Sequence, residues 1–441
     1  MKYYIFILII ILYINTNILY SQESIDNNAF YLDLKAILEN HPKIQSQTMS
    51  LAYKLEEYRY KKTYYPDPRF GIMWSTVPYN KKLKFEFDKS PMSGIEYSLI
   101  QPIPTPGKLT LESKITEKEI ELERIKLAEE YNKTTEKILM LWVSYYASKE
   151  LDLILNQYYD KFKTLTESSK AKYTTGKGNY TDLSKAILLE NKLKEERIAI
   201  KGNIENLKEN LNYYYSIINK TNYEESTYYD SIKQYIELLY KTLPENHTIY
   251  ETTYYNLAKI LPEIDEKKIQ LQKYEYYPDF ELFLSYRETK KIPDDPKSGE
   301  NFMSAGISFR IPLWSALSNP KAVQSQELNL KKTKFDLAEV ELNLKTRLKE
   351  LNIEIQTLKN RQDLYKNVLI PQAELSFNSG LQNYMVGKID FEGFSLILMD
   401  LLNLEKEYIN LRKELDVKII EYLQFSNHIL PEIHQIQGGR Q

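Results

Sequence analysis

The chain has 441 residues and a formal net charge of −2, with 27% charged and 42% hydrophobic residues. This balance predicts a folded protein rather than a disordered one, and the lack of a basic surplus excludes a general binder of nucleic acids. The absence of cysteine excludes thiol catalysis, disulfides, cysteine-ligated metals and a lipid anchor on an N-terminal cysteine.

The N-terminus has the pattern of an export signal. Lys2 supplies a positive charge, residues 5–13 form an apolar run, and a cut after Ser21 would remove residues 1–21. An uncleaved membrane anchor is the alternative, although its run is shorter than the ~20 residues of a spanning helix. No later stretch is apolar enough for such a helix, so the exported chain is expected to be soluble or to insert as strands.

Residues 22–220 and 251–428 contain the same unit twice, separated by an inter-repeat segment at 221–250 and followed by a tail at 429–441. Four landmarks recur in the same order at an offset of about 210 to 220 residues. They are a proline taken to open a helix (Pro42 and Pro262), Tyr-Tyr-Pro-Asp (64–67 and 276–279), Ile-Pro (103–104 and 311–312) and Tyr-x-x-Gly-Lys (173–177 and 384–388). The order of the matches predicts an internal duplication.

Each unit contains two segments in which apolar and other residues alternate, at 69–78 and 93–103 in the first and at 279–288 and 302–312 in the second. Period-two alternation predicts strands, and a length of ~9–11 residues suits a tilted membrane-spanning strand. A strand pair packed on a soluble core is the alternative. The residues expected at the junction between strands and helices are Pro66, Pro104, Gly107, Pro278 and Pro312.

Long helices follow the strands. Residues 108–175 contain no glycine or proline and are followed by a second helical arm at about 180–218. The second unit repeats this pattern from Lys321 to about Tyr384, with Pro371 expected to kink the helix. Turns near 176–180 and 387–391 then make two antiparallel hairpins, which are too long to bury their apolar faces without packing on copies of the chain.

Two strands per unit give four per chain, and the smallest membrane barrels need about eight. Open strand edges are not tolerated in lipid. If the strands span a membrane, several chains must share one barrel, and a cyclic assembly is required.

The duplicated order of motifs resembles the TolC outer-membrane efflux protein family. The matching residues include the segment from Gln101 to Lys108, and Ile370-Pro371-Gln372-Ala373 followed by Tyr384-Met385-Val386-Gly387. The first of these is most similar to heavy-metal efflux members. The resemblance implies a mainly helical fold with a β-barrel part, as a homotrimer whose 12 strands form one barrel over a helical periplasmic tunnel. It also implies a passive exit duct in the outer membrane, coupled to a periplasmic adaptor (membrane fusion protein) and an inner-membrane pump, for efflux or type I secretion of a drug, metal ion or protein.

In that family the tunnel is closed at its periplasmic tip. The resemblance places Gly176, Thr181 and Asp182 in one hairpin tip and Tyr384, Gly387 and Asp390 in the other, with a hydrogen bond between Tyr384 and Asp182 as the candidate gate. The alternative is that Asp182 only places a favourable carboxylate at a helix N-terminus. The family's linking arginine falls on Ile389 and its constricting aspartates fall on Gly393 and Leu396, with Asp390 and Glu392 nearby.

No enzyme motif is present. The four histidines, His41, His247, His428 and His434, are scattered, and neither a phosphate-binding glycine loop nor a Gly-x-Ser-x-Gly motif occurs. We therefore expect no catalytic residue, resident metal or cofactor, and interpret Met73, Met92 and Met303 as packing rather than a soft-metal path. The rival interpretation is a soluble periplasmic coiled-coil adaptor or structural protein, which would share the hairpins but not the strands.

Overall fold

The computed structural model describes residues 28–76, 90–220, 225–243, 248–292, 295–296 and 298–430. The expected signal segment 1–21, most of the tail at 429–441 and most of the loop between the first two strands lie outside the described residues. The chain divides into two compact units. We call Met49–Glu123 with Leu257–Ala338 the strand unit, and Met1–Thr48 with Arg124–Asn256 and Glu339–Gln441 the hairpin unit.

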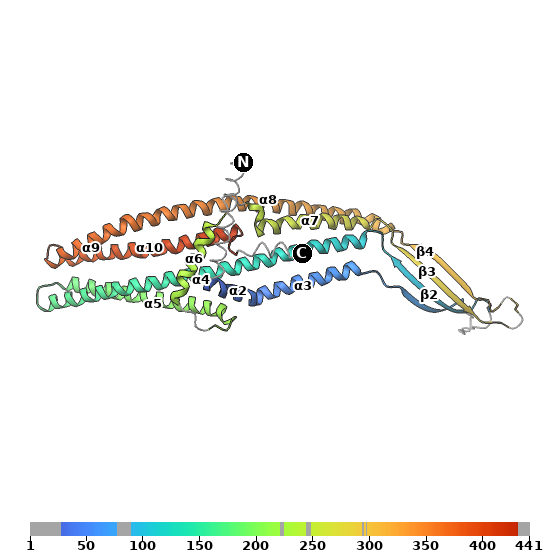
Figure 1. Cartoon of the computed structure of the whole chain (residues 1–441), viewed down its shortest axis with the longest axis horizontal. Coiled ribbons are helices and arrows are strands. Elements are labelled where there is room, and N and C mark those ends of the chain that lie inside the picture. Colours follow the sequence, from blue (N-terminus) through green and yellow to red (C-terminus); the bar gives the residue numbers. More distant parts are fainter. Residues whose placement is uncertain are drawn as a thin grey trace, which may run out of the picture. The chain divides into compact units, whose positions relative to one another are not determined.

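The strand unit contains one antiparallel sheet of four strands in the order β1-β2-β3-β4, visible in Figure 1. The strands are β1 (Arg69–Ser75), β2 (Gly94–Ile103), β3 (Phe280–Thr289) and β4 (Phe302–Phe309). All four predicted strands are present, although β1 and β4 end three residues early. At Thr76 the backbone is left-handed, with φ 58°, and this conformation cannot continue an extended strand.

The helices of the strand unit lie side by side in the same order as the strands that they adjoin. They are the parts within this unit of α3 (Pro42–Thr63), α4 (Lys108–Thr174), α7 (Thr253–Tyr274) and α8 (Leu313–Leu364). Ion pairs at 2.8 Å join Lys54 of α3 to Glu119 of α4 and Lys118 of α4 to Glu263 of α7. Asn329 of α8 donates to Asp265 of α7 at 2.9 Å.

One predicted helix start is wrong. Pro262 lies inside α7, which begins nine residues earlier at Thr253. The amide of Asn256 donates to the carbonyl of Thr252, and the hydroxyl of Thr252 accepts from the amide of Tyr255, so Thr252 supplies the N-terminal cap. In the first repeat the corresponding chain is broken at His41, between α2 (Ala29–Asn40) and α3.

The hairpin unit contains two antiparallel helical hairpins, α4 with α5 (Tyr180–Ser216) and α9 (Ile370–Met385) with α10 (Phe391–Phe425). Helix α6 (Glu225–Lys241) and a short 3-10 helix, η1 (Ile249–Glu251), lie between the repeats in sequence. The helix predicted from Lys321 begins earlier, at Leu313.

Pro371 deforms its helix as predicted, but through a widened turn. A π-helical turn, η2 (Tyr365–Leu369), joins α8 to α9, and Pro371 follows in the first turn of α9. Because proline has no amide hydrogen, it cannot bond to the carbonyl one turn earlier, and a π turn accommodates the displaced carbonyls.

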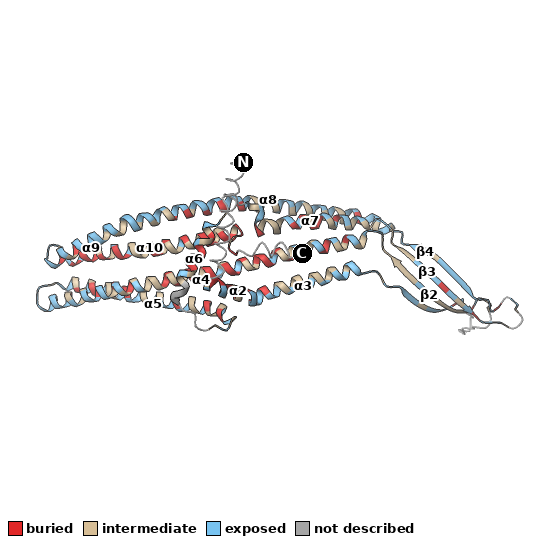
Figure 2. Cartoon of the chain, in the orientation of Figure 1, coloured by how far each residue is buried: buried red, intermediate tan, exposed pale blue. Residues whose placement is uncertain are grey.

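The core of the hairpin unit joins the two hairpins. Leu155, Tyr158 and Phe162 of α4 pack with Leu193 of α5 and with a row of leucines on α10, Leu398, Leu401 and Leu402. Figure 2 shows buried residues recurring along α4 and α10. Helices with periodic apolar faces bury them against each other in this way.

Candidate functional site

The two hairpin tips have the same backbone geometry. Gly176 and Gly387 adopt φ of +71° and +75°, which favours glycine because a Cβ would strain this conformation. In each tip the next amide donates back across the turn at 2.8 Å, from Lys177 to the carbonyl of Lys172 and from Lys388 to that of Asn383. Both tips are therefore Schellman C-caps, and they form the turns predicted near 176–180 and 387–391.

Each returning helix is capped by a side chain that follows the glycine. Asn179 accepts from the amide of Asp182 at 2.7 Å, and Asp390 accepts from the amide of Gly393 at 2.9 Å. The side chain of Asp390 is thus engaged in capping α10. Thr181 and Asp182 lie in the first turn of α5, where a carboxylate interacts favourably with the helix dipole.

Tyr384 lies between the hairpins, but its partners differ from the prediction. Its hydroxyl accepts from Lys172 Nζ at 3.4 Å, and that ammonium lies 4.4 Å from the centre of its ring. The ring stacks on Phe394, in a cluster with Ala186 and Phe391. Among the described residues no Tyr384–Asp182 hydrogen bond is formed. The Tyr384 hydroxyl accepts from Lys172 instead. Lys172 belongs to α4, the helix that precedes Gly176, and its side chain reaches across to α9.

A second link between the tips was missed from the sequence. Lys185 of α5 and Glu392 of α10 form an ion pair at 2.7 Å, and this contact raises the pKa of the Lys185 ammonium. The sequence offered one signal for this ion pair, which is that each residue lies close to the start of a helix that returns from a tip. Lys185 lies in the second turn of α5 and Glu392 in the first turn of α10, the helices that return from the two tips.

The two positions where the family's constricting aspartates fall are Gly393 and Leu396, so no acidic ring is expected there. Gly393 and Leu396 carry no charge, and the Leu396 side chain is 60% exposed. Glu392 and Asp400 are also exposed, and their spacing of four residues on either side of Leu396 places all three on one helix face. The exposed face of α10 near its tip therefore alternates acidic and apolar side chains.

The junction between strands β2 and β3 and the adjoining helices α4 and α7 is held by polar contacts centred on Asp279. Its carboxylate accepts from the amide and the hydroxyl of Thr105 at 2.8 and 3.1 Å. Lys108, at the start of α4, pairs with Glu275 at 2.9 Å and lies 3.5 Å from Asp279. Burial opposes ionisation of Asp279, but the hydrogen bonds from Thr105 and the charge of Lys108 outweigh it and lower the pKa of this carboxyl.

All five predicted junction residues lie between a strand end and the adjoining helix end. The carbonyl of Pro66 accepts from Gln101 at 2.8 Å, and that of Pro278 accepts from Thr105 at 3.1 Å. Gly107 has φ of +92°, and a Cβ there would be 2.6 Å from the hydroxyl of Tyr274. Pro104 follows the last residue of β2, and Pro312 precedes the first of α8.

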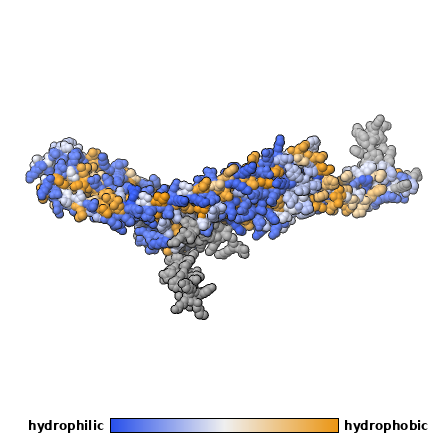
Figure 3. Space-filling view, turned by 90° about the horizontal axis from the view of Figure 1, so that it is seen from above, coloured by the Kyte–Doolittle hydropathy of each residue, from blue (hydrophilic) through white to orange (hydrophobic). Residues whose placement is uncertain are grey.

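The two faces of the sheet differ in chemistry. On one face, exposed apolar side chains recur along the strands: Phe70, Ile72, Trp74, Leu99, Leu282, Leu284, Tyr286, Ile307 and Phe309. The opposite face is more polar. It carries serines and an Arg287–Glu96 ion pair at 2.7 Å, together with the exposed side chains of Met73, Phe283 and Phe302. Figure 3 shows hydrophobic residues gathered on the sheet and on the helix ends beside it. A sheet with one apolar face and one more polar face can separate lipid from an aqueous space.

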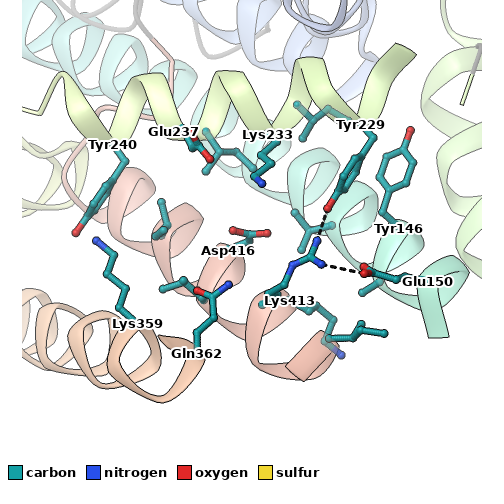
Figure 4. A pocket seen from close by; sticks show the side chains of 18 of the residues that line it. Tyr146, Glu150, Tyr229, Lys233, Glu237, Tyr240, Lys359, Gln362, Lys413 and Asp416 are labelled. Atoms are coloured by element: carbon teal, nitrogen blue, oxygen red, sulfur yellow. Dashed lines mark hydrogen bonds and ion pairs between the residues drawn. The ribbon is translucent and has the colours of Figure 1, made fainter. Parts of the chain in front are cut away.

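A cavity of about 300 Å³ lies in the hairpin unit among α4, α6, α8 and α10, and Figure 4 shows its side chains. Arg412 donates to Glu150 at 2.9 Å and to the hydroxyl of Tyr229 at 2.6 Å. Asp416 lies one turn further along α10, and burial raises the pKa of its carboxyl to about 6 against the attraction of Arg412 and Lys233.

Within the described part of the chain, no group of three or more acidic or histidine side chains could hold a metal ion. No described helix is both long and apolar enough to cross a bilayer.

No family model and no curated protein matches the sequence. Solved structures do match the fold. The Campylobacter jejuni CmeC outer membrane channel is 12% identical with a TM-score of 0.72, covering 94% of this chain and 90% of that one. The Vibrio cholerae outer membrane protein VceC is 13% identical with a TM-score of 0.67, covering 89% and 95%. The CusC channel is 12% identical with a TM-score of 0.73, covering 90% and 92%. The chain therefore has the fold of TolC-type outer-membrane channels, as the resemblance implied.

Proposed function

We propose that the chain is the outer-membrane channel subunit of a tripartite efflux or type I secretion system. In this role it is a passive exit duct, and the inner-membrane pump supplies the energy. The observation that carries the proposal is the four-stranded sheet, which has one apolar face and two unpaired edges, β1 and β4, among the described residues. Unpaired edges are too costly in lipid, and four strands are too few to close a barrel.

Three copies would close the barrel with 12 strands, because β4 of each copy can pair with β1 of the next. Within the chain, β2 pairs with β3 so that Ile100 lies opposite Phe283. The equivalent residues of the other repeat are Ser308 and Gly71, so β4 and β1 of neighbouring copies would meet with Ile307 opposite Ile72. Both isoleucines are large, exposed side chains, as a shared lipid-facing row requires.

The hairpin tips are the proposed docking and gating end. Tyr180, Met385 and Val386 are each more than two-thirds exposed at the tips, which suits contact with the periplasmic adaptor. Opening would separate the α9/α10 hairpin from the α4/α5 hairpin, by breaking the contacts of Tyr384 with Lys172 and of Lys185 with Glu392.

The test combines three measurements on the exported protein. We expect it in the outer-membrane fraction, with a native mass of three chains in detergent and with stepwise conductance in planar bilayers. Recovery as a soluble periplasmic protein without conductance would support an adaptor or structural role and refute the channel. A chemical turnover that persists without a membrane would indicate an enzyme instead.

A further inference from the structure

The more polar face of the sheet carries charges of both signs, and each charge has a partner of the opposite sign. Glu96 of β2 and Arg287 of β3 are directly opposite in the register and form an ion pair at 2.7 Å. Arg69 of β1 reaches across β2 to form an ion pair with Glu281 of β3. Within the described strands these four are the only charged residues on this face, so its acidic and basic groups cancel.

The two ion pairs lie at different levels of the sheet. Glu281 and Arg287 are six positions apart on β3, which corresponds to about 20 Å along a strand. The Arg69–Glu281 pair lies near the strand ends that join the helices, and the Glu96–Arg287 pair lies near the opposite ends. Between the two levels an uncharged row crosses all four strands: Gly71, Ser98, Ser285 and Ser304. Charge is therefore cancelled separately at each level.

The Arg69–Glu281 pair joins equivalent positions of the two repeats. Each residue lies two positions after the aspartate of a Tyr-Tyr-Pro-Asp motif, yet the two carry opposite charges. If three copies close one barrel, three arginines and three glutamates alternate around the lumen at this level. The same residue in both repeats would instead give six charges of one sign.

The lumen expected for such a barrel is narrow enough for charges on its wall to act on passing ions. Side chains fill the interior of a barrel of about eight strands, and an aqueous channel remains in one of about 16. Three copies of the four-stranded sheet lie between these cases. An unpaired charge acts over a screening length of about 10 Å at 0.1 M salt, whereas opposite charges 2.7 Å apart cancel at that distance.

Resting on the proposed function, we propose that the Glu96–Arg287 and Arg69–Glu281 pairs make the lumen of the barrel indifferent to the sign of a cargo's charge. Anions, cations and uncharged molecules then pass this part of the duct alike. The four residues determine specificity by cancellation, since removal of one partner leaves three like charges around the lumen and makes the channel selective.

Reversal potentials in planar bilayers under a KCl gradient test this inference. R287Q leaves Glu96 unpaired, so the ratio of K⁺ to Cl⁻ permeability should rise at least about twofold over wild type at about 0.1 M KCl. E96Q leaves Arg287 unpaired and should lower the ratio by a similar factor. The double variant E96Q/R287Q should return to the wild-type ratio. All shifts should shrink at about 1 M KCl, where the screening length is about 3 Å.

The matched control is E288Q. Glu288 follows Arg287 on β3 and is exposed, but successive residues of a strand point to opposite faces, so Glu288 lies on the apolar face. Loss of its charge should leave the permeability ratio unchanged. If R287Q does not assemble into a trimer, R69Q and E281Q carry the same test at the other level, where the two side chains are 61% and 41% exposed.

The outcomes separate the inference from the proposed function. A shift for E288Q as large as that for E96Q, or wild-type ratios for both single variants in channels that conduct, would overturn the inference and leave the channel standing. Failure of the double variant to restore the ratio would also overturn it, because the two charges would then not cancel. A wild-type chain that neither reaches the outer membrane nor conducts would refute the proposed function itself.

Discussion

The ring of Tyr384 is stacked on the ring of Phe394, with centroids 5.1 Å apart and planes 9° from parallel. Tyr384 belongs to α9 and Phe394 to α10, so the stack closes the second hairpin at its tip. The ammonium of Lys172 of α4 lies 4.4 Å from the centre of the same ring. One tyrosine therefore connects three helices at the hairpin tips, where an adaptor is proposed to act.

Replacing Tyr384 should weaken the proposed closed state, and the effect should depend on how much of the side chain is removed. Y384A removes the stack and the cation contact, which for a buried aromatic costs about 3 kcal/mol or more, and should raise single-channel conductance in planar bilayers. Y384F keeps the ring and removes only the long hydrogen bond, so its conductance should stay close to wild type. Equal conductance of Y384A and wild type would remove Tyr384 from the gate.

The Lys185–Glu392 pair allows a charge-swap test. Both side chains are about half exposed, so water screens the pair and its contribution to folding stability is small. K185E and E392K should each increase conductance modestly by placing like charges together, and the double variant should restore the wild-type value. Failure of the double variant to restore it would mean that the two side chains act on conductance separately.

Gly387 should be intolerant of a side chain. At φ +75° a G387A variant adds backbone strain of about 1 kcal/mol, and the midpoint of thermal unfolding followed by circular dichroism should fall. The matched control is G202A in the interior of α5, where a Cβ would meet nothing within 4 Å. That substitution should raise the midpoint, because alanine favours helix by about 1 kcal/mol. A rise for both variants would contradict the strained turn.

The aspartates of the two Tyr-Tyr-Pro-Asp motifs should contribute unequally to the free energy of unfolding. D279A leaves the amide of Thr105 without its acceptor, while the hydroxyl keeps only the carbonyl of Pro278, and should destabilise the protein by about 1–3 kcal/mol. Asp67 is the equivalent residue of the first repeat and is exposed. D67A should cost less than about 0.5 kcal/mol. Comparison of thermal midpoints in detergent decides this prediction, and similar decreases for both variants would refute it.

Asp416 should make stability depend on pH in the opposite direction to an ion-paired carboxylate. Its pKa is raised to about 6 in the folded chain, so the folded state holds the proton more tightly than the unfolded state. Stability contributed by protonated Asp416 is present below about pH 4 and is lost as the pH rises to about 6, in total on the order of 2–3 kcal/mol. Arg412 and Lys233 attract the ionised carboxylate and Glu237 repels it, but burial outweighs the attraction.

The measurement is thermal unfolding of wild type and D416N between pH 4 and 7. The amide cannot ionise, so the difference in midpoint between the two proteins should grow in favour of D416N as the pH rises to 6 and then stay constant. A difference that does not change with pH would show that Asp416 keeps an ordinary pKa.

The repeating parts of the fold were predictable because repetition makes weak local signals add up. Four short alternating segments indicated the strands, and two Tyr-x-x-Gly-Lys motifs indicated the turns at Gly176 and Gly387. The start of α7 was not predictable from Pro262, since proline is tolerated inside a helix when packing compensates for its missing hydrogen bond. The partner of Tyr384 was also missed. Asp182 and Lys172 flank the same turn, and only the three-dimensional arrangement shows which of them reaches the phenol.

The π turn before Pro371 gives the two hairpins unequal bending stiffness. Through the first hairpin α4 continues unbroken for 67 residues, and each peptide bonds to the next turn of the helix. The corresponding arm of the second hairpin is interrupted at Tyr365–Leu369, where the regular ladder of hydrogen bonds is replaced. A force applied at the tips is therefore expected to bend the second hairpin at this turn, while the first transmits the force along its length.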